Sequence, residues 1–144
     1  MKGLQEKILV DSAALLDWFN DMPSAEIVER NLERAAVSAI TLSIVASKIG
    51  EKVEPHESTR LLNLGFEVFD VDEQVALEIA RVSYATISHD LAIEDLVLLA
   101  TGRVHQIDVI SGSDALIGVK LDEPSVTTLR KARRPVKSRR QPSD

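Results

Sequence analysis

Four short apolar segments, separated from one another by longer helical patterns, constrain the fold of this chain most. The apolar segments are residues 8–10 (ILV), 36–40 (AVSAI), 66–70 (FEVFD) and 107–112 (IDVISG). Consecutive strands that are separated by a helix usually run parallel in one sheet, because a parallel pair needs a crossover connection. The sequence therefore predicts an α/β domain with a largely parallel central sheet, whose ligands lie beyond the carboxyl ends of the strands.

The helices between these strands are predicted from apolar periodicity and from the residues at their ends. Asp72 and Glu73 begin one helix, and Gly50 and Gly65 each end another. The predicted helices cover residues 12–20, 24–35, 41–50, 54–63, 72–87 and 91–103, and residues 113–118 (SDALIG) are expected to form a short helix or turn.

The 144 residues suit one compact domain, but charge is distributed unevenly along them. Seven basic residues and one acid lie in residues 129–144, so the rest of the chain carries ten basic and 22 acidic residues. We expect an α/β domain over residues 1–121 and a basic, disordered tail over residues 122–144, which has little apolar surface to bury. The acidic domain disfavours broad, sequence-independent binding of nucleic acid, while the tail leaves a local RNA-binding arm open.

The absence of cysteine excludes disulfides, thiolate zinc sites and cysteine nucleophiles, and it is typical of proteins of a reducing cytoplasm. Near the N-terminus, Lys2 and Lys7 precede an apolar run of three residues before Asp11. A run of that length is too short for a signal peptide or a membrane span. We therefore expect a cytoplasmic protein that does not enter a membrane.

Acidic side chains stand at three positions where a buried or apolar environment is expected. Asp11 directly follows the first strand, and Asp95 projects from the apolar stripe of its own helix. The segment SGSD at 111–114 follows another predicted strand and brings Asp114 to the same edge of the sheet. Carboxylates that meet in this way repel one another and are stabilised by a divalent cation such as Mg²⁺.

Each of these acids also has a structural explanation. Asp11 is a favoured N-cap residue for the helix that follows it, and Asp95 suits the dipole at the N-terminus of its helix. Asp114 suits the cap of a short last turn. The three positions together indicate a cation site more strongly than any one of them alone.

Four segments, in this order and spacing, carry a further pattern. They read ILVDSAALLDWFNDMPSAEIVERNL, VSAITLSIVASKIG, LAIEDLVLLATGR and DVISGSDAL, and they extend over roughly residues 7–118. This pattern resembles the PIN domain family, and within it the VapC-type toxins of toxin–antitoxin pairs. The resemblance implies a three-layer α/β sandwich, usually a homodimer, whose acidic pocket holds Mg²⁺ or Mn²⁺ and cleaves single-stranded RNA. It also implies a small antitoxin protein that blocks the site, often with an arginine.

When the family's acidic positions are carried over residue by residue, two of four match. The first acid falls on Asp11 and the third on Asp95. The second, a glutamate in the family, falls on Ile44, with Ser43 beside it. The fourth, an aspartate or asparagine in the family, falls on Ser113.

The predicted catalytic and metal-binding residues are therefore Asp11, Asp95 and Asp114, although Asp114 comes one residue late in the pattern; Ser113 and Glu94 are expected to have minor roles. Two hypotheses follow from this set. The chain is a metal-dependent endoribonuclease with a reduced number of ligands, or it is a degenerate PIN domain that acts as a protein- or RNA-binding regulatory module. The second is open because the loss of even an outer-shell carboxylate typically lowers metal affinity or activity about 10- to 100-fold.

Overall fold

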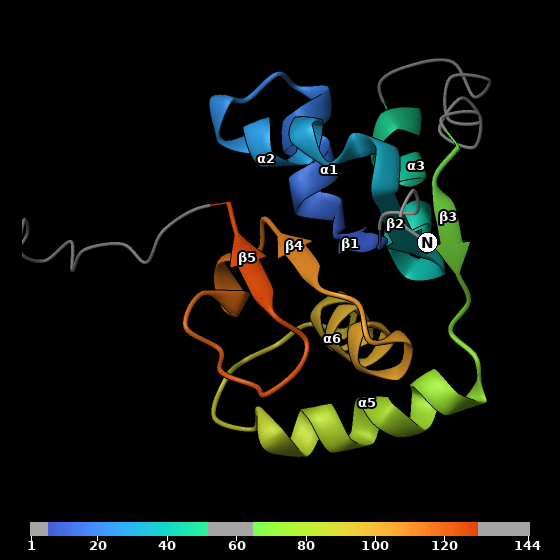
Figure 1. Cartoon of the computed structure of the whole chain (residues 1–144), viewed down its shortest axis with the longest axis vertical. Helices are drawn as coiled ribbons and strands as arrows, with labels where there is room; N and C mark the ends of the chain where they lie inside the picture. The colour runs from blue at the N-terminus through green and yellow to red at the C-terminus, as the bar shows by residue number, and fades with distance from the viewer. Residues whose placement is uncertain (1–5, 52–64, 130–144) are drawn as a thin grey trace, which may run out of the picture.

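The computed structural model describes residues 6–51 and 65–129 and contains a five-stranded, all-parallel sheet (Figure 1). The strand order in the sheet is β3-β2-β1-β4-β5. The strands are β1 (Ile8–Val10), β2 (Ala35–Ser38), β3 (Glu67–Phe69), β4 (Val109–Ser111) and β5 (Val126–Thr128). This arrangement confirms the predicted α/β fold with a parallel central sheet.

Helices cover both faces of the sheet and make the fold a three-layer sandwich (Figure 1). One face carries α1 (Ser12–Phe19), α2 (Glu26–Arg30) and α3 (Ala39–Gly50), and the other carries α5 (Glu73–Ala85) and α6 (Ile93–His105).

Successive residues of the central strands divide between two apolar cores. In β1, Ile8 and Val10 pack under α1 and α3, whereas Leu9 packs under α5 and α6. All three residues are buried, because a strand with helices on both faces leaves neither side to solvent. The continuous apolar run of β1 is therefore explained by its central position.

The order of the strands also fixes where a ligand site can lie. The chain builds the sheet outward from β1 in one direction through β2 and β3, and then in the other direction through β4 and β5. In open parallel sheets of this kind, a crevice opens beyond the carboxyl ends of the strands at the point where the order reverses. Here that point lies between the ends of β1 and β4.

Most predicted elements are shifted at their ends by one or two residues, and two differ more substantially. The helix predicted over residues 24–35 is divided into a 3-10 turn (Pro23–Ala25), α2 and a second 3-10 turn (Leu32–Arg34). The division occurs at Asn31, whose side-chain nitrogen donates a hydrogen bond to the carbonyl oxygen of Ile27 (2.8 Å) and so replaces a bond of a continuing helix.

The second difference is β5, which the sequence analysis did not anticipate. It lies within residues 122–144, the predicted tail, and it pairs with β4 at the edge of the sheet. The strand is short and has one apolar residue, so its sequence carries no alternating pattern. The rest of the predicted tail, residues 130–144, and the predicted helix at residues 54–63 lie outside the described residues. The domain boundary at residue 121 stays a prediction.

The helices within the described residues are all too short, or too polar, to cross a membrane.

Candidate acidic site at the carboxyl edge of the sheet

Asp11 directly follows β1, at the point where the strand order reverses between β1 and β4, and is almost completely buried, with 1% of its surface exposed. Its Oδ1 atom accepts hydrogen bonds from the backbone N–H groups of Ala14 (2.9 Å) and Gly112 (3.0 Å). Its Oδ2 atom accepts a hydrogen bond from the Ser111 hydroxyl (2.6 Å). The contact with Ala14 makes Asp11 the N-cap of α1, so the structural explanation considered for this residue is confirmed. The other two contacts tie it to the end of β4.

Burial dominates the electrostatics of Asp11. It raises the pKa of the carboxyl from its ordinary value of 3.8 to about 6. The hydrogen bonds from Ser111, Gly112 and Ala14 lower the pKa, but they offset burial in part, and the nearby charge of Glu94 raises it further. At neutral pH the fold therefore holds an ionised carboxylate in a place that disfavours its charge.

Asp95 is the third residue of α6 and is also buried. Its Oδ2 atom accepts a hydrogen bond from the backbone N–H of Ala92 (3.0 Å), so the expected role at the N-terminus of the helix is confirmed. Burial raises the pKa of Asp95, bonds from Ala92 and the Ser113 hydroxyl lower it, and the charge of Glu94 raises it. Asp95 and Asp11 thus both contact the loop that follows β4, one through Ser113 and the other through Ser111 and Gly112.

Glu94 joins three elements at this site, which is more than the minor role expected from the sequence. Its two carboxylate oxygens accept hydrogen bonds from the backbone N–H (2.8 Å) and the hydroxyl (2.7 Å) of Ser12, the first residue of α1. The same carboxylate accepts a hydrogen bond from the hydroxyl of Thr41, in the first turn of α3 (2.7 Å). Its charge acts on both Asp11 and Asp95, so the three carboxylates share one electrostatic neighbourhood.

The sequence analysis placed Ser111 at this edge, within SGSD, but it missed Ser12 and Thr41 as partners of these acids. Ser12, Thr41 and Ser111 are buried and each donates a side-chain hydrogen bond to Asp11 or Glu94. Each lies within three residues of the carboxyl end of a central strand, a position where the topology favours ligand sites. This position in the sequence could have pointed to them. It does not distinguish a hydroxyl that binds a site carboxylate from one that only caps a helix.

The remaining predicted positions lie nearby with different surroundings. Asp114 is exposed and begins a 3-10 turn (Asp114–Leu116), which Ser113 caps through its side chain. The suggestion that Asp114 caps this turn is therefore wrong, because the backbone places the Ser113 hydroxyl where it accepts from Ala115 (3.3 Å). The assignment of Asp114 as a catalytic or metal-binding residue stays a prediction. Ile44 is half-buried on α3, one turn beyond Thr41.

The donor atoms limit how a cation could be held. Among the described residues, no group of three or more histidine, aspartate or glutamate side chains is arranged to bind a metal ion. A carboxylate offers about four acceptor positions, and the carboxylates of Asp11 and Glu94 each accept three hydrogen bonds from the protein. Mg²⁺ is commonly bound through one or two carboxylates and keeps several waters. The residues therefore fit a hydrated cation held by Asp11 and Asp95 better than a fully dehydrated one.

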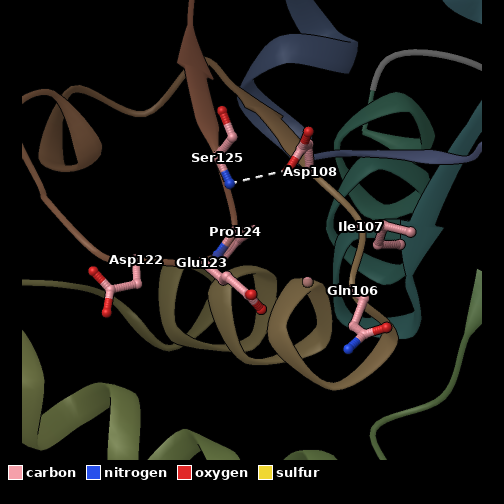
Figure 2. A pocket seen from close by; sticks show the side chains of 8 residues that line it. Gln106, Ile107, Asp108, Asp122, Glu123, Pro124 and Ser125 are labelled. Carbon is pink, nitrogen blue, oxygen red and sulfur yellow. Dashed lines mark hydrogen bonds between the residues drawn. The ribbon is translucent and has the colours of Figure 1, made fainter.

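A cavity of about 240 Å³ lies at the opposite, amino edge of the sheet (Figure 2). It lies between the end of α6 and the loop before β5, and Asp108, Asp122 and Glu123 are among the residues that line it. Asp108 accepts a hydrogen bond from the backbone N–H of Ser125 (3.0 Å) and so fixes the start of β5. The cavity is separate from the buried acids, and nothing that lines it belongs to the predicted site.

Comparison with known proteins agrees with this fold. The solved structures that are similar include a toxin–antitoxin complex from Klebsiella pneumoniae (TM-score 0.68, 21% identity, covering 87% of this chain and 99% of that chain). A DNA-bound VapBC from Salmonella typhimurium (TM-score 0.66, 16% identity) covers 88% of this chain and 100% of that chain. FitAcB from Neisseria gonorrhoeae (TM-score 0.63, 22% identity) covers 85% and 97%. None of the curated proteins matches the chain. The family model described as PIN domain matches residues 8–117, and the chain therefore belongs to the PIN domain family.

Proposed function

We propose that this PIN domain is an endoribonuclease of the VapC toxin type that hydrolyses single-stranded RNA with the help of Mg²⁺ or Mn²⁺. The observation that supports it most is the meeting of Asp11, Glu94 and Asp95 beyond the carboxyl ends of β1 and β4. Burial raises the pKa of both aspartates, and a bound cation would favour their ionised forms.

In this proposal Asp11 and Asp95 hold the hydrated cation. The cation, when bound, polarises the phosphate and lowers the pKa of an attacking water. The donors on Asp11, namely the Ser111 hydroxyl and the N–H groups of Gly112 and Ala14, fix the orientation of its carboxylate. Hydrogen bonds to a metal-binding carboxylate commonly set its orientation and its affinity for the metal. Asp114 remains a candidate for a further ligand, since it is exposed beside the loop that carries Ser113.

The proposed protein partner is a small antitoxin, and the proposed assembly is a homodimer in the cytoplasm. The similar solved structures include a complex whose description names a toxin and an antitoxin, and VapBC bound to DNA. An acidic pocket is complementary to a basic side chain such as arginine, which is the residue that the resemblance implies for an inhibiting partner.

RNA cleavage tests this proposal directly. The purified chain is expected to cut a single-stranded RNA when Mn²⁺ or Mg²⁺ is present, and to stop when EDTA is added. Asp11→Asn is expected to remove the activity. Glu73→Ala is a matched control, because Glu73 is an exposed acid in the first turn of α5 and takes no part in the hydrogen bonds of the site. No cleavage of any single-stranded RNA across a range of Mn²⁺ concentrations would contradict the proposal.

A second candidate is a PIN domain that binds a protein or RNA without cutting it. Ile44 stands where the family pattern has a glutamate, and three hydrogen bonds from Ser12 and Thr41 already occupy the carboxylate of Glu94. For this module, Mn²⁺ is expected to leave the melting temperature of the chain unchanged. A rise in melting temperature that saturates with Mn²⁺ and is lost in Asp11→Asn would favour the nuclease instead.

A further inference from the structure

The carboxylate of Glu94 lies where three helices begin. It reaches from the second residue of α6 to the first residue of α1 and to the first turn of α3. The N–H of Ser12 is one of the donors that a helix leaves without a partner in its first turn, and Glu94 accepts from it at 2.8 Å. An anionic group near helix N-termini is also favoured by their dipoles. One side chain thus fixes the relative positions of the elements that surround Asp11 and Asp95.

An apolar side chain, Ile44, lies one turn from Thr41 on α3. Ile44 follows Thr41 by three residues on α3, so the two side chains share one face of the helix. Thr41 is the α3 residue that donates to Glu94, at 2.7 Å. Ile44 is half-buried and is absent from both apolar cores, although Val45 beside it is fully buried in one of them. A carboxylate introduced at position 44 would therefore lie one turn from the hydroxyl that binds Glu94, on the same face of α3.

We propose that Glu94 is the positioning residue of this pocket and supplies, from α6, the carboxylate that the sequence lacks at Ile44. The reasoning is that Glu94 is bonded to α3 through Thr41, one turn from Ile44, and carries the charge that acts on both buried aspartates. The inference rests on the proposed function, since it concerns the arrangement of the same pocket, but its test does not depend on RNA cleavage.

The inference predicts that residues 44 and 94 are coupled. Ile44→Glu alone is expected to destabilise the chain, because it places a second carboxylate beside Glu94 and competes for the Thr41 hydroxyl. Glu94→Ala alone is expected to destabilise it, because three donors lose their acceptor. The double variant is expected to be more stable than the sum of the two effects predicts, by about tenfold in the unfolding equilibrium constant, which is about 1.4 kcal/mol.

The experiment is a double-mutant cycle measured by urea denaturation of the full chain, with Glu73→Ala as the control for loss of an exposed acid in the first turn of a helix. The expected result is that Ile44→Glu in the Glu94→Ala background recovers stability, while the same change combined with Glu73→Ala does not. Glu94→Gln is included because it keeps the size of the side chain. It is expected to be less stable than the natural chain, since its amide nitrogen cannot accept a hydrogen bond.

A second readout separates positioning from packing. The rise in melting temperature on addition of Mn²⁺ is expected to be smaller in Glu94→Ala and to return in the double variant. Effects of the two substitutions that add within about twofold in the unfolding equilibrium constant would overturn the inference. So would a Glu94→Gln variant as stable as the natural chain. If Mn²⁺ stabilises neither the natural chain nor the variants, but residues 44 and 94 are coupled in the double-mutant cycle, the proposed metal-dependent function fails and the positioning role of Glu94 stands.

Discussion

Asp11→Asn is expected to make the chain more stable at pH 8, even though it removes the residue most central to the proposed site. The carboxylate of Asp11 is 1% exposed, and burial raises its pKa from 3.8 to about 6 in spite of three hydrogen bonds from Ser111, Gly112 and Ala14. Above that pH the folded chain holds a charge in an environment that disfavours it. A neutral side chain of the same shape removes this unfavourable term.

The sign and size follow from the two pKa values of Asp11. Because the folded pKa lies above the unfolded one, the folded state binds the proton more tightly between pH 3.8 and about 6. The stability that protonation contributes is fully present below pH 3.8 and is lost as the pH rises through about 6. The difference between the two values corresponds to about 3 kcal/mol.

The hydrogen bonds of the variant reduce this gain. An asparagine oxygen can still accept from the N–H groups of Gly112 and Ala14, which both donate to Oδ1. In the natural chain the Ser111 hydroxyl donates a hydrogen bond to Oδ2 of Asp11. In the variant the amide nitrogen takes the place of Oδ2, so the hydroxyl must rotate to accept a hydrogen bond from it. That change is expected to cost about 1 kcal/mol. The net gain in the free energy of unfolding at pH 8 is therefore about 2 kcal/mol, and at pH 4.5 it falls to zero or below.

Urea denaturation at pH 4.5 and pH 8, in EDTA, measures this difference. Trp18 is the single tryptophan of the chain and packs against the core under α1, so its fluorescence reports unfolding. EDTA is needed because a bound cation would stabilise the ionised carboxylate. If Asp11→Asn lowers the free energy of unfolding by the same amount at both pH values, the reasoning about the buried charge is wrong.

Three further substitutions test the surroundings of the site and the fold. Ser111→Ala removes the hydroxyl that donates to Oδ2 of Asp11. It is expected to lower the free energy of unfolding by about 1–2 kcal/mol at pH 8 and by less at pH 4.5, measured by urea denaturation at the two pH values. Gly112→Ala places a Cβ atom 2.8–3.0 Å from the first turn of α1, mainly against backbone atoms. The clash is expected to lower the free energy of unfolding by about 1–3 kcal/mol. A melting temperature within about 2 °C of that of the natural chain would contradict it. Arg103→Met breaks the ion pair with Glu78 (2.7 Å), which helps to lower the pKa of Glu78 against the effect of burial. Its destabilisation at pH 7, about 1 kcal/mol or less, is expected to diminish as the pH falls through the folded pKa of Glu78. An effect of full size at pH 2 would show that packing, or the lost bond from Arg103 to the Glu123 carbonyl (3.1 Å), is responsible.

Sequence reasoning was most successful where a local pattern carries the information. The apolar run from Ile8 to Val10 predicted a buried strand, and the aspartate after it predicted both a helix cap and a site residue; the structure confirms the strand and the cap. Asp95 was singled out because it interrupts an apolar stripe, and the structure places it, buried, beside the same loop as Asp11. Both signals are local, since they depend on residues within about one helical turn.

The sequence by itself thus determined the parallel α/β fold, the PIN resemblance and the buried positions of Asp11 and Asp95. Strand and helix periodicities and cap residues depend only on residues that are close together in the chain, so they can be recognised there. Only the tertiary structure decided that β5 extends the sheet and that Glu94 binds the first turns of α1 and α3. The bonds from Glu94 to Ser12 and Thr41 connect residues 82 and 53 positions apart. No local pattern predicts such contacts, because they exist only when the strand order brings the N-termini of α1, α3 and α6 to one edge of the sheet.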